Sequence, residues 1–152
     1  MEVFARNTRL TADHITEITK VKTSWSPKNH FIFPRPKDLV RLAVTVGQNR
    51  GRLSDAYNAL RAVDRKTGMV DPARQGEELD KIKSATPLIL NPLNWDEISR
   101  VLVKGGFRSK KMITSSTTIL YTYSLWILGR TKYKVELATL RDLMARWFLC
   151  LR

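Results

Sequence analysis

The sequence predicts an all-α fold, in a single helical, bundle-like domain of five to seven helices. Apolar residues recur at spacings of three and four along several segments, and residues that cap or end helices flank these segments. No run of alternating β-branched residues bounded by turn dipeptides occurs. With 152 residues, of which 43% are hydrophobic and 27% charged, the chain is long enough to bury a core without disulfides or metal.

The first part of the chain, residues 1–33, is predicted to hold one helix and a connector. The helix covers residues 12–22, where isoleucine and valine residues are spaced by three. The sequence HFIFPRP follows, and its two prolines favour an extended connector. Residues 34–152 are predicted to form the helical core of the domain.

Four helices are predicted in the first part of this core. The first of these helices is predicted to begin at Pro36, since proline is favourable in a first turn, and to end at Gly47. Asp71, followed by Pro72, is predicted to cap the third, although Gly76 weakens its helical signal. The fourth is predicted to begin with a capping box, in which Asn94 is the N-cap and Glu97 reaches back to it. The four ranges are 36–47, 54–65, 72–84 and 95–104.

Residues 112–128 are predicted to form the central helix, packed by the 95–104 helix and by a last helix. The segment is apolar around most of its circumference, which is typical of a buried helix. Its length is at the lower limit for a membrane span and it carries many Ser and Thr, so a soluble core helix is the preferred interpretation. Its aromatic residues Tyr121, Tyr123 and Trp126 are predicted to belong to the core.

The last helix, over residues 135–151, has a strong amphipathic pattern. Its apolar end would be poorly placed in water, so Trp147, Phe148 and Leu151 are predicted to pack into the core. Cys150 lies among apolar neighbours and is predicted to be buried.

The sequence offers few residues for a metal or cofactor site. His14 and His30 lie in different segments, and Cys150 is the only cysteine, so a structural zinc site has too few ligands. No P-loop, dinucleotide-binding glycine pattern or Gly-x-Ser-x-Gly motif occurs. No catalytic residue, metal ligand or cofactor is therefore predicted. A single cysteine and the lack of a secretory signal favour the cytoplasm.

The strongest functional signal is the charge. A formal net charge of +13 favours polyanionic partners, because each phosphate neutralised by Lys or Arg releases counterions. A solvated basic face, or a segment separated from an acidic neighbour, would give the same imbalance, and both interpretations stay open. The predicted nucleic-acid-binding residues are Arg50, Arg52, Arg61, Arg65, Lys66, Arg108, Lys110, Lys111, Arg130, Lys132 and Lys134.

Two of the basic loops flank the 112–128 helix. A rise of about 1.5 Å per residue separates them by roughly 25 Å, so they are predicted to contact phosphates separately rather than to form one patch. Reading of base edges needs a side chain on an exposed helix face, and the best candidates are Arg61, Arg65 and Lys66.

Several segments of the second half resemble a known family. Trp95, GGF at 105–107, ITSSTTILYTYSLWIL at 113–128 and LMARWFL at 143–149 are similar, in kind and order, to the helical middle region of the GmrSD-type restriction proteins. That region joins a ParB-like nuclease domain to an HNH nuclease domain. The resemblance covers about residues 85–149 and implies a helical fold, a link to a restriction or defence nuclease, and a chain that is one piece of a larger multidomain protein.

The catalytic motifs of that family are missing here. The Asp-Gly-Gln-Gln-Arg type motif of the ParB-like domain and the His and Asn of the HNH domain do not occur, so the resemblance implies no catalytic residue.

The predicted function is a non-catalytic helical module that contacts nucleic acid or a nuclease partner through its basic loops. One alternative is a protein-interaction or structural domain, in which an apolar strip on the terminal helix docks another chain or a second copy. The other is a metal-dependent nuclease, in which carboxylates such as Asp55, Asp71 and Asp80 converge on a metal. No membrane partner is predicted.

Overall fold

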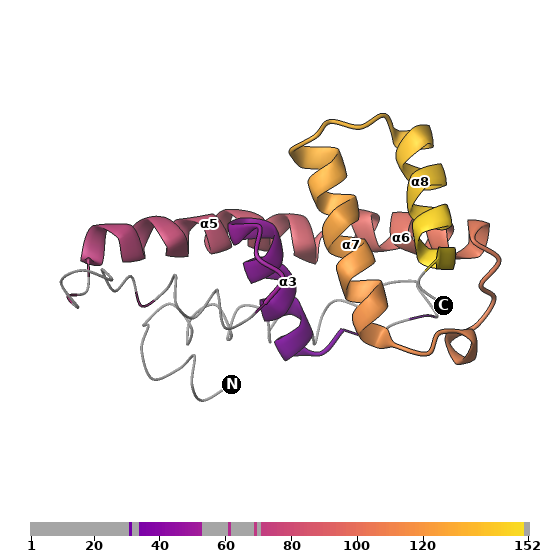
Figure 1. Ribbon diagram of the computed structural model, residues 1–152, viewed down its shortest axis with the longest axis horizontal. Coiled ribbons are helices and arrows are strands. Elements are labelled where there is room, and N and C mark those ends of the chain that lie inside the picture. Colours follow the sequence, from indigo (N-terminus) through magenta and orange to yellow (C-terminus); the bar gives the residue numbers. More distant parts are fainter. Residues whose placement is uncertain (1–30, 32–33, 53–60, 62–68, 70, 151–152) are drawn as a thin grey trace. The chain divides into compact units, whose positions relative to one another are not determined.

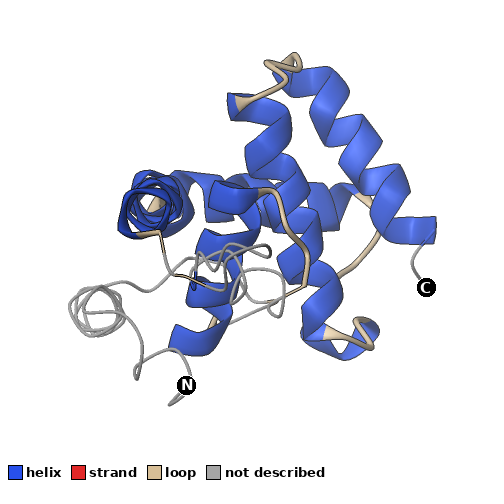
Figure 2. Cartoon of the chain, turned by 60° about the vertical axis from the view of Figure 1, so that its left-hand side comes forward, coloured by secondary structure: helices blue, strands red, loops and turns tan. Residues whose placement is uncertain are grey.

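The protein is helical throughout the part that the computed structural model describes, which comprises residues 31, 34–52, 61, 69 and 71–150. These residues form five α-helices and one 3-10 helix and no strand, which confirms the predicted all-α fold (Figure 2). The helices predicted over 12–22 and 54–65 lie outside the described residues, apart from the helical Arg61. The elements in Figure 1 are α3 (Pro36–Gln48), α5 (Pro72–Leu90), α6 (Pro92–Lys104), η1 (Lys110–Met112), α7 (Ser116–Thr131) and α8 (Leu137–Cys150).

The described part of the chain divides into two compact units. The first unit contains α3 and α5, which pack against each other. Gly47 allows this close packing, because a Cβ atom there would lie only 2.5 Å from the carbonyl oxygen of Lys81. The buried apolar residues of the two helices are Leu39, Leu42, Ala43, Val44 and Val46 on α3 and Ile82, Ala85 and Ile89 on α5.

Helix α5 is longer than predicted. Its start agrees with the sequence, since Oδ1 of Asp71 accepts hydrogen bonds from the backbone N–H groups of Ala73 (3.0 Å) and Arg74 (3.3 Å). The helix then continues beyond residue 84 and through Pro87 to Leu90. Pro87 is exposed, whereas Ala85 and Ile89 are buried. Burial of this apolar face outweighs the unfavourable proline.

The second unit contains α6, α7 and α8, which pack on one another as predicted. Helices α7 and α8 run antiparallel, side by side (Figure 1). Their contact is close, because a Cβ at Gly129 would lie 2.8 Å from a methyl group of Leu140. Trp95 of α6 stacks on Tyr123 of α7 with ring centroids 3.9 Å apart. Burial raises the pKa of the Tyr123 phenol, which stays neutral in this core.

The start of α6 differs from the prediction. The N-cap is Asn91, whose Oδ1 accepts a hydrogen bond of 3.0 Å from the N–H of Leu93, and Asn94 lies inside the helix. The predicted capping box is therefore wrong, because Asn91 followed by a proline offers a cap one turn earlier. Glu97 instead binds Arg100 (2.7 Å) and, across to α8, Arg141 (2.6 Å).

The boundaries of α7 also shift. Met112 belongs to η1, and Ile113 and Ser115 are extended, so helix α7 begins only at Ser116; it runs past Gly129 to Thr131. Gly129 therefore serves the contact with α8 and does not end the helix. None of the described helices is long and apolar enough to cross a membrane. The predicted end of α6 is correct, since Gly105 is its C-cap.

Three residues predicted to be buried are exposed. Tyr121 is 39% exposed, Trp147 is 41% exposed, and Cys150 lies at the surface. The reason is helical phase: Leu140, Met144 and Phe148 form the buried row of α8, and Trp147 is one residue, or about 100° of rotation, away from it. Phe148 is buried as predicted, and Leu151 lies outside the described residues.

Candidate nucleic-acid interface

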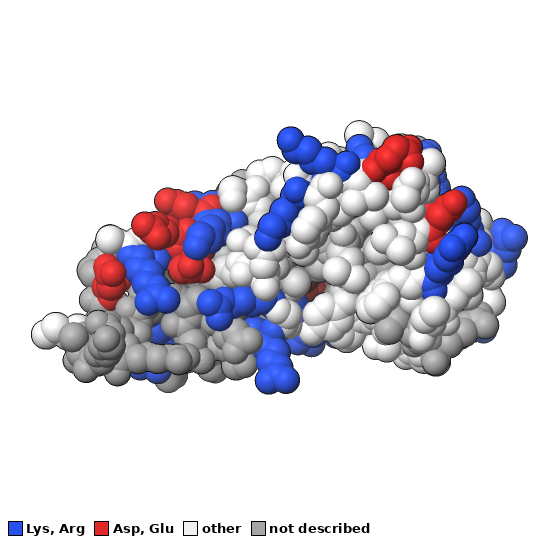
Figure 3. All heavy atoms as spheres, turned by 45° about the horizontal axis from the view of Figure 1, so that its top comes forward, with Lys and Arg blue, Asp and Glu red and all other residues white. Residues whose placement is uncertain are grey.

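The predicted basic residues fall into separate groups. Arg50 and Arg52 are exposed after the end of α3, and Arg61 is exposed in the same unit; Arg65 and Lys66 lie outside the described residues. The other six residues belong to the second unit, are all exposed, and lie at the two ends of α7. In Figure 3 the basic side chains stand out as separate groups on a largely uncharged surface, with acidic atoms directly beside some of them.

The first group in the second unit, named here the η1 cluster, consists of Arg108, Lys110 and Lys111. Gly106, at φ 86°, lets the chain turn sharply after α6. The 3-10 helix η1 then presents both lysines to solvent, and the N–H of Arg108 donates to the sulfur of Met112 at 3.2 Å. This short, internally bonded turn holds three cations close together at the entrance to α7.

The second group, named here the α7-end cluster, consists of Arg130, Lys132 and Lys134. Nη1 of Arg130 donates to the carbonyl oxygen of Val135 at 3.2 Å, which ties the end of α7 to the loop that follows. Lys132 lies over the ring of Tyr133, with Nζ 5.7 Å from its centroid. Lys134 has φ 49°, the left-handed conformation that reverses the chain toward α8.

Three of the four acidic residues in this part of the chain already have partners in the structure. Residues 91–150 hold ten Lys or Arg and four Asp or Glu. Glu97 binds two arginines, Asp142 binds Lys104, and Glu136 accepts hydrogen bonds from the start of α8. No salt bridge among the described residues involves the η1 cluster or the α7-end cluster. The charge of Arg130 acts on the nearby Glu136. The five other residues of the two clusters, and Arg146 of α8, therefore have no ion-pair partner among the described residues.

The two clusters are kept apart by the helix between them. Helix α7 has 16 residues, which corresponds to a length of about 24 Å. This agrees with the separation expected from the sequence. Each cluster can contact phosphate groups by itself, and a duplex, with a charge about every 1.7 Å along its axis, presents phosphates to both.

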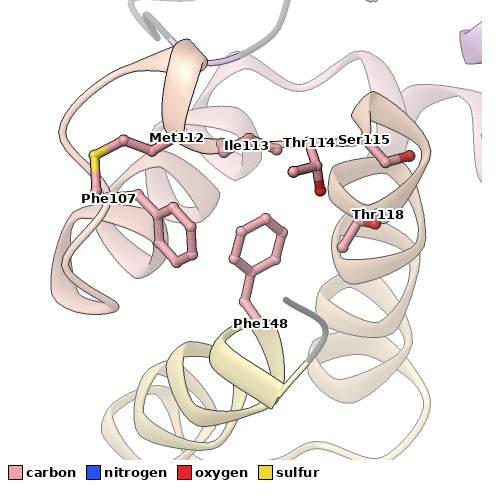
Figure 4. A pocket seen from close by; sticks show the side chains of 7 residues that line it. All are labelled: Phe107, Met112, Ile113, Thr114, Ser115, Thr118 and Phe148. Atoms are coloured by element: carbon pink, nitrogen blue, oxygen red, sulfur yellow. The ribbon is translucent and has the colours of Figure 1, made fainter.

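A cavity beside the η1 cluster was not anticipated from the sequence. It has a volume of about 270 Å³ and lies between the turn after α6, the start of α7 and the end of α8 (Figure 4). The rings of Phe107 and Phe148 meet edge to face, with centroids 4.8 Å apart, and line one side. The other lining residues are Met112, Ile113, Thr114, Ser115 and Thr118.

The carboxylates proposed for the nuclease alternative have other roles in the structure. Asp71 caps α5, and Asp80 forms a salt bridge of 3.3 Å with Lys83; Asp55 lies outside the described residues. Within the described ranges, no three His, Cys, Asp or Glu side chains group together in a way that could hold a metal ion.

No protein-family model, curated protein or solved structure matches this chain. The similarity to the GmrSD-type middle region therefore stays a prediction.

Proposed function

We propose that this protein is a non-catalytic helical module that binds nucleic acid through the phosphate backbone. The observation that carries the proposal is the exposed positive charge of the η1 cluster and the α7-end cluster, whose side chains form no salt bridge among the described residues. A role beside a restriction or defence nuclease in the cytoplasm is the wider setting that we infer from the sequence resemblance.

Phosphate contact is the mode of binding that these clusters favour. Their side chains are long and exposed and lie at the two ends of α7 and in the short 3-10 helix η1, so they reach a phosphate backbone more readily than the floor of a groove. Lys and Arg bound to phosphate release counterions, and the affinity should therefore fall steeply with salt concentration.

The test compares two double variants of equal charge. Lys110→Gln with Lys111→Gln removes two cations of the η1 cluster. Lys81→Gln with Lys83→Gln removes two exposed cations of α5 that are already paired with Glu78 and Asp80. Fluorescence anisotropy with a labelled duplex, over a series of salt concentrations, gives the slope of log K against log salt for each protein.

We expect the first pair of substitutions to reduce the magnitude of this slope by about 2, since each lost phosphate contact on duplex DNA contributes about 0.9. The second pair should leave the slope close to that of the wild type. Equal slopes in both variants would mean that only overall charge matters, and no measurable binding at low salt would refute the proposal.

A second candidate function, self-association, is favoured by an exposed apolar strip on the α7–α8 hairpin. Leu125 and Tyr121 lie one and two turns before Gly129 on α7, and Leu143 and Trp147 lie one and two turns after Leu140 on α8. These four side chains, named here the hairpin strip, are between 38% and 53% exposed.

The charges beside the hairpin strip suit a second copy of the same chain. Asp142 and Arg146 are one turn apart on α8, in the row next to Leu143 and Trp147. If two α8 helices meet antiparallel about a twofold axis, Leu143 of each faces Trp147 of the other. Arg146 of each then faces Asp142 of the other, which within its own chain already binds Lys104.

A further inference from the structure

We propose that the cavity beside the η1 cluster receives a single unstacked nucleobase, whose phosphate is held by Lys110, Lys111 and Arg108. This inference rests on the proposed function and narrows it to nucleic acid with unpaired bases. The ligand chemistry is a flat heteroaromatic ring attached to a phosphate, which either a single strand or a free nucleotide supplies.

The size of the cavity fits one ring system. Pockets for drug-sized ligands begin at about 300 Å³, and this cavity, at about 270 Å³, lies just below that range. Met112 is 40% exposed, and Thr114 and Ser115 also reach the surface, so the cavity is accessible at the side formed by these residues.

The lining has the two kinds of surface that a base requires. Phe107, Met112, Ile113 and Phe148 supply aromatic, thioether and aliphatic contacts for the faces of a ring. Thr114, Ser115 and Thr118 line the opposite side, and the hydroxyl of Thr114 points toward the cavity, where it can donate or accept a hydrogen bond at the ring edge (Figure 4).

The cavity and the cations are physically continuous. Phe107 and Met112 line the cavity, and the η1 cluster lies on the short segment between them. A base in the cavity would therefore have its own phosphate within reach of these side chains. Aromatic contact combined with a basic surface is the general way in which proteins bind single strands without strict sequence preference.

The test uses a matched pair of serine variants. Ser115 and Ser109 are both exposed N-cap residues without a side-chain capping bond, and only Ser115 lines the cavity. Ser115→Phe should fill the cavity, and Ser109→Phe adds the same ring outside it. Circular dichroism and thermal melting show whether both variants are folded. The probes are a labelled DNA strand, the same strand with abasic sites throughout, and a duplex of equal length.

Electrostatics alone would favour the duplex, which has the higher charge density. We expect the wild type instead to bind the base-bearing strand at least about fivefold more tightly than the abasic strand, as expected for one stacked base. Ser115→Phe should remove this difference while leaving duplex binding unchanged, and Ser109→Phe should keep it.

Equal affinity of the wild type for the base-bearing and abasic strands, or equal behaviour of the two serine variants, would overturn this inference. Duplex binding with its salt slope would still support the proposed function, so the two failures are distinguishable. A competition experiment separates the two sources of the ligand. If AMP displaces the strand and inorganic phosphate does not, the ligand of the cavity is a free nucleotide. If AMP does not compete, the ligand is a base of the strand.

Discussion

At the scale of a single residue, two glycines of the first unit should respond in opposite ways to replacement by alanine. Gly47 of α3 sits where an added Cβ would lie 2.5 Å from the carbonyl oxygen of Lys81, a backbone atom that cannot move aside. Gly76 of α5 has nothing within 4 Å of such an atom. We expect Gly47→Ala to destabilise the protein by about 1–3 kcal/mol through overpacking. Gly76→Ala should stabilise it by about 0.5–1 kcal/mol, because alanine favours the helix.

Urea unfolding followed by circular dichroism measures both effects, with each variant serving as the control for the other. A stabilising Gly47→Ala would show that α3 and α5 do not approach as closely as the structure indicates. In the sequence, Gly47 is predicted to end its helix and Gly76 to weaken the helix that contains it. Neither prediction indicates which of the two glycines packs closely against a neighbouring helix. Only the distance to the neighbouring backbone reveals the difference.

At the scale of an element, the start of α8 depends on one carboxylate. The oxygens of Glu136 accept hydrogen bonds from the backbone N–H groups of Ala138 (2.9 Å) and Thr139 (2.8 Å) and from the hydroxyl of Thr139 (2.9 Å). These bonds, the one from Ala138 first, lower the pKa of Glu136 below its ordinary value of 4.5. The ionised form is therefore the one that stabilises the helix.

The sign of the pH dependence follows from this direction. A carboxyl group whose pKa is lower in the folded state contributes stability above its ordinary pKa and loses it as the pH falls through the folded value. We expect Glu136→Gln to be less stable than the wild type near pH 7, and the difference to vanish as the pH is lowered through about 4 and below. Glu77→Gln, on the exposed surface of α5, removes a charge elsewhere as the control. The measurement is the urea midpoint of each protein from acid to neutral pH. A difference between the wild type and Glu136→Gln that stayed constant over this range would contradict the prediction.

The helices themselves were largely predictable, whereas their boundaries were less so. Apolar periodicity depends on many residues, so it identified α3, α6, α7 and α8 despite local errors. A boundary depends on one cap, and the sequence offers competing candidates. Asn91 and Asn94 are both good N-caps, and Glu136 is a residue type that rarely fills this role. The continuation of α5 through Pro87 follows from tertiary burial, which no local pattern reports.

At the scale of the whole molecule, charge was predictable and surface shape was not. A net charge of +13 and the basic loops are visible in the sequence, as is their separation by one helix. The cavity combines residues 107–118 with Phe148, which approach only when α8 packs beside α7. The hairpin strip has the same origin, since Tyr121 and Trp147 read as core residues until the helical phase of both partners is known.

Net charge also decides how the two candidate functions respond to salt. Two copies of a chain with net charge +13 repel each other, and added salt screens this repulsion. If the hairpin strip joins two copies, the average mass measured by light scattering should rise with protein concentration and rise further between about 0.05 M and about 0.5 M salt. Nucleic-acid binding should weaken over the same range.

Leu143→Glu would place two carboxylates in the proposed interface and should return the protein to monomer mass. Leu93→Glu adds the same charge at a residue that is 69% exposed outside the hairpin strip, and should not. A monomer mass for the wild type at all concentrations and salt levels would exclude self-association. If the Leu143→Glu variant is still dimeric, this surface is not the interface. Burying an unpaired carboxylate would cost more free energy than the hairpin strip contributes to association.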